Sequence, residues 1–538
     1  MDAAAPDPVV GRPWWLPWIG VALLIAGSFA SVWWATSTGA TDGVLLNGDE
    51  AVAALLPTTF ARSGVTVIFP GNAYQGVLEV PVYAVVQALG GGVLAMRLLH
   101  QGIWLGALVT WTAAVWTLLD DPDRPLGRAA RGWVLLTVLG LAGVTSLVGW
   151  QVWFHLYPGY QSGALLAGLA VFVAARMQRS GRSRPILWVV AGALAGLAIY
   201  AQPMHVVGAV CLGVLALSSA DRIRAVACSA LGTAVGVAPW IWWNVVHDMA
   251  VLDARARPAQ HPDWGYPDRL ANTARITMDV LWGDGRIRSD VPTWVVVCQV
   301  VAATAMIAAV AVGVVALVRS WRRSAALIVG VVVMLLALPA MPTFSLDIDQ
   351  RYAVGWWPAL AVLVAAGSVR LAALRNPWRS LARGAVIAAV VCHVAAAVGL
   401  AAPAISTRRD TPAAVVTTSD LGGDLRRCGV DIVAGGYWAI YPASWGSDGD
   451  LDAAVIGDTQ RLPRPSPRSW RVDAVAVLAT PNGPPAETYA AEVSDRHGRG
   501  TSGWTRYVHR PTGVTVLLEE DVTPPDGCIS RSGLTPSS

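Results

Sequence analysis

Residues 293–318 read TWVVVCQVVAATAMIAAVAVGVVALV, and this stretch contains no charged side chain. A helix needs about 20 apolar residues to cross the hydrocarbon of a bilayer, so the stretch predicts a transmembrane helix. The whole chain agrees, because 54% of its 538 residues are hydrophobic and only 14% are charged. A soluble globular domain carries about 25% charged residues. These proportions exclude a soluble enzyme of this length and a largely disordered chain.

Other apolar blocks of similar length flank this stretch, and we expect about eleven transmembrane helices in all. The least regular part lies between 186 and 220, where Gln202, Pro203 and His205 interrupt one long apolar run, so that two short helices fit better than one. The expected spans are residues 14–34, 95–119, 132–150, 160–176, 186–201, 204–220, 223–243, 293–318, 324–341, 352–369 and 384–404.

Arginine placement predicts the orientation, because positively charged loops stay in the cytoplasm. With a cytoplasmic N-terminus, the internal loops carry more Arg than most external connections. The exception is the external loop 244–291, where Asp residues balance the Arg residues. The first external segment, 35–94, mixes carboxylates with apolar residues and is expected to form helices on the outer membrane surface. We therefore predict a multi-pass plasma-membrane protein embedded in the bilayer through residues 1–404.

The composition changes near residue 405, where Asp, Gly, Pro, Ser and Thr become frequent. Short β-type runs separated by turn-rich stretches predict a mixed α/β domain over 405–538, outside the membrane, with about 15 disordered residues at its end. Cys428 and Cys528 lie in this region, and two Cys in one small extracytoplasmic domain favour a disulfide over two free thiols. The predicted β runs are 413–417, 430–434, 453–457, 473–479 and 514–519.

The sequence Asn47-Gly48-Asp49-Glu50 follows the first span. Adjacent carboxylates at a membrane surface suit a general base or a metal ligand. The alternative interpretation is a solvated turn in which Asp49 caps the next helix. The spacing of the two carboxylates does not by itself distinguish a catalytic or metal-binding pair from a capped turn.

Five further side chains face the same predicted compartment. Arg351, beside Tyr352 at the entrance of a span, can hold an anionic group with its donor fork, or else extend to the lipid phosphates. A polar cleft has three candidate residues: Gln202 with His205, and separately His155. A single His beside a span is, however, more often an interface residue whose hydrogen bonds are made.

The chain contains no phosphate-binding glycine loop, no dinucleotide-binding glycine signature, no HExxH and no zinc-type Cys pairs. We therefore assign no metal ligands from these motifs, and we expect no nucleic-acid partner and no cytoplasmic nucleotide domain. A transferase with this organisation would take its donor from outside, and a lipid-linked donor meets that need.

Four stretches occur in an order shared with a known family. They are Asn47-Gly48-Asp49-Glu50-Ala51, Phe69-Pro70-Gly71-Asn72-Ala73-Tyr74-Gln75-Gly76-Val77-Leu78-Glu79, Gln350-Arg351-Tyr352 before Pro358, and Gly435-Gly436-Tyr437-Trp438-Ala439-Ile440-Tyr441. Together they resemble the membrane-embedded C-type (GT-C) glycosyltransferases that use polyprenyl-phosphate sugars. This group includes protein O-mannosyltransferases, the aminoarabinose transferase of lipid A and actinobacterial cell-wall mannosyl- and arabinosyltransferases. The last stretch corresponds to a strand of the family's periplasmic domain.

The resemblance implies a GT-C fold and inverting transfer to an extracytoplasmic glycan, glycolipid or protein. Asp49 would be the general base, with Glu50 orienting it or the acceptor. Arg351 and Tyr352 would bind the donor phosphate. Tyr74 and Glu79 would shape the cleft for the sugar or the acceptor, with a structural role for Glu79 as the equal alternative. Some members use a divalent metal and others do not, so no cofactor is required and a divalent cation stays open at the two carboxylates.

Arg62 is a second cation candidate for the donor phosphate, without a motif match. The family pattern differs at Pro70 and Asn72, and the chain has no Lys, which leaves the sugar and the acceptor open. Two rival functions remain: a transporter or flippase for a lipid-linked sugar, and an inactive sugar-binding membrane scaffold. Flippases place charges in the middle of spans, whereas the charges here are predicted to gather at one face.

Overall fold

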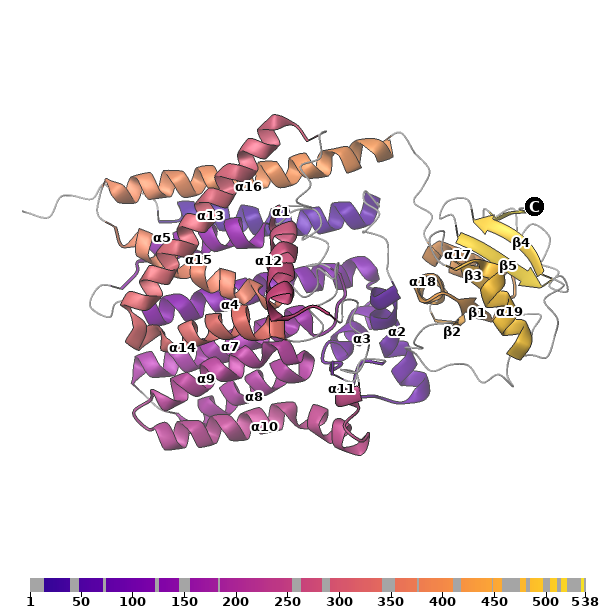
Figure 1. The fold of residues 1–538 in the computed structure, drawn as a ribbon, viewed down its shortest axis with the longest axis horizontal. Helices are drawn as coiled ribbons and strands as arrows, with labels where there is room; N and C mark the ends of the chain where they lie inside the picture. The colour runs from indigo at the N-terminus through magenta and orange to yellow at the C-terminus, as the bar shows by residue number, and fades with distance from the viewer. Residues whose placement is uncertain are drawn as a thin grey trace, which may run out of the picture.

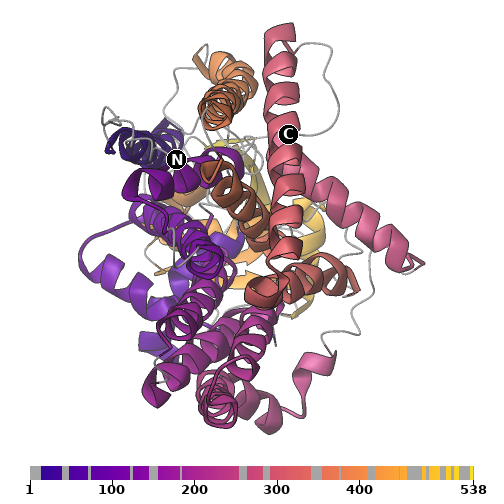
Figure 2. The ribbon, with the colours of Figure 1, turned by 90° about the vertical axis from the view of Figure 1, so that its left-hand side faces the viewer.

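Apolar helices form one bundle, and a small sheet lies beyond one of its ends (Figure 1). Figure 2 looks at the opposite end, with the sheet behind the helices. The computed structural model describes residues 14–38, 48–70, 74–120, 125–144, 155–181, 184–253, 263–282, 291–340, 354–374, 377–409, 418–447, 449–456, 475–479, 484–496, 504–509, 514–519 and 534–536.

Six described helices are long and apolar enough to cross a membrane. They are α1 (Leu16–Thr38), α4 (Val93–Leu119), α7 (Tyr160–Ser180), α10 (Arg222–Val246), α13 (Thr293–Arg319) and α16 (Trp378–Arg409). Three shorter apolar segments are α8 (Pro185–Ala201), η3 (Pro203–His205) with α9 (Val206–Leu217), and α15 (Trp357–Ala372). The two remaining predicted spans are α5 (Arg128–Val138) with η2 (Leu139–Gly143), and α14 (Trp321–Val332) with η5 (Val333–Ala337) and η6 (Leu338–Ala340). The largely helical membrane architecture is confirmed, and the total of eleven spans stays a prediction.

Glycines bring α8 and α10 into backbone contact. A Cβ on Gly196 would lie 2.3 Å from the carbonyl oxygen of Thr233, and one on Gly232 would lie 2.1 Å from that of Val189. Small residues four positions apart on two facing helices allow this close approach, which replaces the hydrophobic effect as the packing force between helices in lipid.

The two connections predicted to be external both contain helices. These are α2 (Gly48–Ser63) and α3 (Val80–Ala88) in the first, and α11 (Ala250–Asp253) and α12 (Tyr266–Trp282) in the second. In the second half of the first external segment, the chain becomes helical only from Val80, directly before Pro81, because Pro is favoured at the first positions of a helix.

The C-terminal sheet has six strands in the order β2-β1-β3-β5-β4-β6. The strands β2, β1 and β3 are parallel, and the others are antiparallel. Their bounds are β1 Ile432–Gly435, β2 Asp452–Val455, β3 Val475–Ala479, β4 Trp504–His509, β5 Val514–Glu519 and β6 Leu534–Pro536, and the helices of this region are α17 (Thr418–Arg427), α18 (Tyr437–Gly446) and α19 (Ala486–Arg496).

Four of the five β runs fall on strands, and residues 413–417 lie outside the described residues. The prediction of disorder at the very end is wrong for Leu534–Pro536, because this segment pairs with β4 and buries Leu534. The segment satisfies backbone groups at the sheet edge that β4 would otherwise expose.

The stretch 437–441, which the family resemblance assigns to a strand, is instead the start of α18. Gly435 ends β1 with a φ of +139°, a conformation that favours glycine. After it, all six residues from Ala439 to Ser444 are buried. The helix α18 is therefore enclosed by its surroundings, and it packs against α17 and α2.

The helix α18 packs against α2, so the C-terminal sheet and the first external segment share one core. Leu55 and Leu56 of α2 are buried in the same cluster as Ile440 and Tyr441 of α18 and Val433 of β1. The helix α2, which begins with the two predicted catalytic carboxylates, therefore lies between the bundle and the sheet (Figure 1).

Candidate active site

Asp49 and Glu50 occupy the first turn of α2 but lie in different environments. The side chain of Asp49 is half-buried, whereas Glu50 is fully buried. Consecutive residues of a helix point about 100° apart. The rotation of α2 that directs Glu50 into the protein therefore leaves Asp49 at the edge of the buried region.

Glu50 pairs with Arg97, near the start of α4. The Arg97 Nε and Nη2 atoms donate to the two carboxylate oxygens at 3.1 and 2.7 Å, and both side chains are buried. Burial by itself would raise the pKa of Glu50, but the Arg97 charge, helped by His155 and two hydrogen bonds, lowers the pKa to about 2. Glu50 is therefore an anion that joins α2 to α4.

Three more groups surround this ion pair. His155 Nδ1 lies 3.9 Å from the Glu50 carboxylate, and the Leu156 backbone N–H donates to it at 3.1 Å. Thr36, near the end of α1, is 3.4 Å from Arg97 Nη1. Groups far apart in the sequence thus fix the start of α2.

Glu79 is a second buried carboxyl and has no arginine beside it in the described contacts. Its Oε1 atom accepts hydrogen bonds from the Gly159 backbone N–H at 2.5 Å and from the Ser162 hydroxyl. Burial raises the pKa of Glu79, and these two bonds offset only part of the rise. Glu79 therefore fastens α3 to the start of α7.

Tyr83 and His100 form a buried pair near these carboxyls. The Tyr83 hydroxyl hydrogen-bonds with His100 Nε2, and the two rings stack with centroids 5.6 Å apart. Burial, with Glu79 and Glu50 nearby, raises the pKa of Tyr83 well above its ordinary value. Tyr83 is therefore a neutral partner within the polar cluster.

The predicted cleft residues Tyr74, Gln202 and His205 lie around the same part of the molecule. The Tyr74 carbonyl accepts a hydrogen bond from Trp240 Nε1 at 3.2 Å. Gln202 and His205 are buried, and a Cβ on Gly163 would lie 2.1 Å from the His205 ring.

Several of the predicted residues converge on the stretch 155–163. This stretch contains His155, contacts Glu50 and Glu79, and packs against His205. The sequence motifs around 49 and 79 therefore meet in space through a segment that carries no motif of its own.

The remaining predicted residues are either placed away from this stretch or fall outside the described residues. Arg62, at the end of α2, is half-exposed, and donates to the Gly449 carbonyl at 2.6 Å and to Asp450 at 3.1 Å. Arg351 and Tyr352 lie outside the described residues. Cys428 is buried and disulfide-bonded, while Cys528 lies outside the described residues.

Sequence reasoning missed Arg97 and the pair formed by Tyr83 and His100. Arg97 falls inside the predicted span 95–119, and an ionisable residue in a span is a functional candidate by default. That signal was present in the sequence. No sequence signal joins Arg97 to Glu50, because the contact depends on how α2 turns back onto α4.

The described residues contain no group of three or more His, Cys, Asp or Glu side chains arranged to hold a metal ion. The Glu50 carboxylate is engaged by Arg97 and the Leu156 amide. A divalent cation at the Asp49–Glu50 pair would have to compete with that arginine.

The fold and the site describe a polytopic helical membrane protein with a carboxylate pair beside a buried arginine. Its fold is similar to that of ArnT from Cupriavidus metallidurans. The crystal structure in the apo state has a TM-score of 0.57 and 15% sequence identity, covering 94% of this chain and 99% of that chain. The structure bound to undecaprenyl phosphate has a TM-score of 0.51 with the same identity and coverage. No protein-family model and no curated protein sequence matches the chain. The likeness supports the predicted GT-C fold.

Proposed function

We propose that this protein is an inverting GT-C glycosyltransferase that moves a sugar from a polyprenyl-phosphate donor to an extracytoplasmic acceptor. The observation that carries the proposal is the first turn of α2, where a half-buried Asp49 follows the fold's first span and adjoins a fixed Glu50. The similarity of the whole chain to ArnT, one structure of which holds undecaprenyl phosphate, supports a lipid-linked donor.

Asp49 acts as the general base. Its carboxylate takes the proton of an acceptor hydroxyl as the acceptor oxygen forms a bond to the anomeric carbon. The bond from that carbon to the phosphate oxygen breaks on the opposite side, so the configuration inverts. The polyprenyl phosphate leaves with the bonding electron pair and gains negative charge.

The leaving phosphate needs fixed cationic donors, and we assign this role to Arg351 with Tyr352. Arg62 is a weaker candidate because Gly449 and Asp450 already engage its guanidinium. Glu50 acts as a positioning residue through its ion pair. We assign the walls of the substrate cleft to Tyr74, Glu79, Gln202, His205 and His155. Glu79, Gln202 and His205 contact the segment 155–163, which contains His155, and Tyr74 lies against Trp240.

We propose residues 1–404 as the membrane-embedded catalytic domain and 405–538 as an extracytoplasmic domain. The N-terminus lies in the cytoplasm, and Asp49 lies at the outer face. The acceptor is a cell-wall glycan, a glycolipid or a protein, and the sugar is a hexose or pentose such as mannose or arabinose.

The test is sugar transfer by the purified protein in lipid nanodiscs, with labelled polyprenyl-phosphate mannose and polyprenyl-phosphate arabinose offered to a membrane extract that contains acceptors. Asp49→Asn keeps the size of the side chain and removes the base. We expect transfer to fall by about 10²- to 10⁴-fold, the usual contribution of general-base catalysis. Folding and donor binding should persist.

Two results would count against the mechanism. Unchanged transfer by the Asp49→Asn protein would remove Asp49 as the base. An absence of transfer from every lipid donor by the wild-type protein, together with movement or binding of those donors, would favour a flippase or a scaffold.

A further inference from the structure

The segments 67–70 and 74–77, between α2 and α3, form the two arms of a short hairpin. They lie antiparallel, with a bridge between Ile68 and Gly76. A side chain from a distant helix, Tyr200 in the last turn of α8, contacts both arms. This contact ties the connection after α2 to the helix bundle.

We propose that Tyr200 is a positioning residue for the transfer reaction. It fixes the hairpin, and with it Tyr74, which is assigned above to the substrate cleft. This role rests on the proposed function. It adds to that function a residue that carries no motif, is buried and acts through the hairpin instead of touching the substrate.

The Tyr200 hydroxyl joins the two arms. It donates to the Val67 carbonyl of the first arm at 2.7 Å and accepts from the Val77 backbone N–H of the second arm at 3.3 Å. A tyrosine hydroxyl is both donor and acceptor, so the two bonds form at once. An isolated two-stranded hairpin is at best marginally stable. The hydroxyl therefore adds a cross-link to arms that pair by a single isolated bridge.

The backbone at the end of α8 holds the second arm as well. The last carbonyls of a helix have no partner within the helix. Here the Tyr200 carbonyl accepts the Gly76 backbone N–H at 2.9 Å. A Cβ on Gly76 would lie 2.6 Å from this carbonyl oxygen and 2.6 Å from the Tyr200 ring. The second arm thus lies directly on Tyr200, with no room for a side chain at position 76.

Two further contacts link the second arm to the candidate site. The Trp240 indole N–H of α10 donates to the Tyr74 carbonyl at 3.2 Å. The Gln75 side-chain amide donates to the Pro158 carbonyl. Pro158 belongs to the stretch 155–163, which also contacts both buried carboxyls of the site. Loosening the hairpin at Tyr200 should therefore shift Tyr74 relative to that stretch.

The arrangement predicts which kinetic constant depends on Tyr200. The proposed base, Asp49, follows the separate anchor that Glu50 makes with Arg97. A displaced hairpin should therefore weaken substrate binding without disturbing the proton transfer. Such a change raises KM and leaves kcat nearly unchanged.

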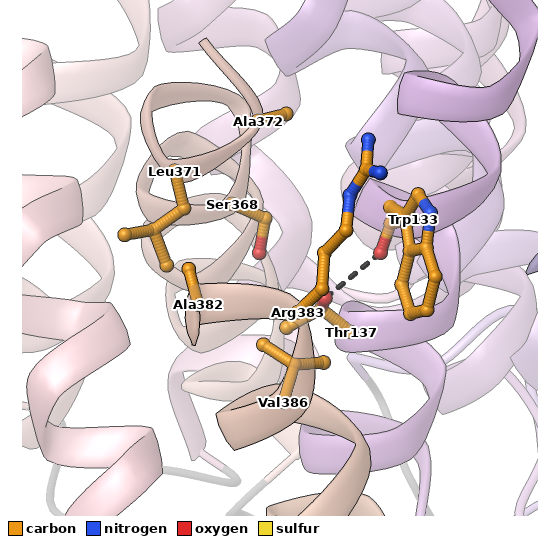
Figure 3. A pocket seen from close by; sticks show the side chains of 8 residues that line it. All are labelled: Trp133, Thr137, Ser368, Leu371, Ala372, Ala382, Arg383 and Val386. Atoms are coloured by element: carbon orange, nitrogen blue, oxygen red, sulfur yellow. Dashed lines mark hydrogen bonds between the residues drawn. The ribbon is translucent and has the colours of Figure 1, made fainter. Parts of the chain in front are cut away.

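The first measurement is amide hydrogen exchange of the full-length protein in lipid nanodiscs, which requires no activity. Tyr200→Phe removes only the hydroxyl, and we expect exchange in peptides covering the two arms to become about tenfold faster, as for the loss of one hydrogen bond. The matched control is Thr137→Val on α5, at the far end of the bundle from α2 (Figure 1). It also removes a buried hydroxyl, which donates to the Trp133 carbonyl at 2.8 Å (Figure 3). It should leave exchange in the arms unchanged.

The second measurement is sugar-transfer kinetics of Tyr200→Phe, Tyr74→Ala and the double variant. Tyr200→Phe should raise the KM for the donor or the acceptor about 3- to 10-fold, with kcat within about twofold of the wild type. In the Tyr74→Ala background the same change should raise KM no further, because the hairpin then presents no tyrosine. A residue that only stabilises the fold would give independent, multiplicative effects.

The outcomes separate this role from the proposed function. Unchanged exchange in the arms of Tyr200→Phe, or effects on KM that multiply in the double variant, would overturn the positioning role while the wild type still transfers sugar. A wild-type protein that transfers sugar from no lipid donor would refute the proposed function, and the positioning role with it. In that case faster exchange in Tyr200→Phe would show only that Tyr200 holds the hairpin.

Discussion

The guanidinium of Arg97 donates two hydrogen bonds, of 3.1 and 2.7 Å, to the carboxylate of Glu50, and both side chains are buried. The contact joins the start of α4 to the start of α2. Asp49 is the residue directly before Glu50, so its position depends on this ion pair. The pair therefore connects the stability of the fold to the geometry of the proposed reaction.

Breaking this pair from either side should destabilise the protein. Glu50→Gln leaves a buried arginine without its counter-charge, and Arg97→Leu leaves a buried carboxylate alone. Each change should cost about 3–5 kcal/mol of unfolding free energy. The double variant should recover part of that loss, because no uncompensated charge remains. Denaturation of the four proteins in one detergent measures the coupling, and strictly additive losses would contradict it.

The same pair predicts how stability changes with pH. The pKa of Glu50 is lowered from 4.5 to about 2 in the folded protein. Between these values the unfolded state binds the proton and the folded state does not, so stability falls as the pH falls through this window. The contribution of Glu50 is roughly 3 kcal/mol.

Other carboxyls titrate in the same window, so the useful quantity is the difference between the wild type and Glu50→Gln. This difference should be constant above about pH 5 and should shrink as the pH falls toward 2. Unfolding free energies measured across this pH range provide the check. A difference that does not change with pH would mean that Glu50 is not held as an anion.

A further prediction concerns the glycine contact between α8 and α10. Gly232→Ala places a Cβ 2.1 Å from the Val189 carbonyl oxygen, so one helix must move. We expect a loss of about 1–3 kcal/mol in stability, the usual cost of overpacking. Gly213→Ala in α9 is the control, because its Cβ meets nothing within 4 Å. It should be neutral or stabilising by up to about 1 kcal/mol. Equal effects in thermal unfolding would refute the close contact.

Local sequence patterns predicted the elements of this fold well. Long apolar runs became helices such as α13, and the run 514–519 coincides with β5. They failed where a contact between distant segments decides the structure. The segment Leu534–Pro536 pairs with the edge of β4, and the stretch 437–441 begins a helix that packs against both α17 and α2.

For the candidate site, too, sequence patterns predicted some residues and missed the contacts between distant segments. The motifs around Asp49 and Glu79 lie on α2 and directly before α3, and the structure brings both to the same part of the molecule. Their partners could not be predicted, because Arg97 and Gly159 reach them only after the helices pack. Burial also separates two adjacent carboxylates that look equivalent in the sequence, leaving Glu50 enclosed and Asp49 at the edge.

The last prediction separates two roles for Arg62. This residue holds the loop after α18 through Gly449 and Asp450, and it was also a candidate for the donor phosphate. The ion pair is half-exposed, so Arg62→Ala and Asp450→Ala should each change stability by about 1 kcal/mol or less. If Arg62 only braces the C-terminal domain, both variants should leave the KM for the lipid donor unchanged or change it equally. We expect that result, given the existing contacts of Arg62. A rise in donor KM confined to Arg62→Ala would instead place Arg62 at the phosphate, because Asp450→Ala leaves the guanidinium intact.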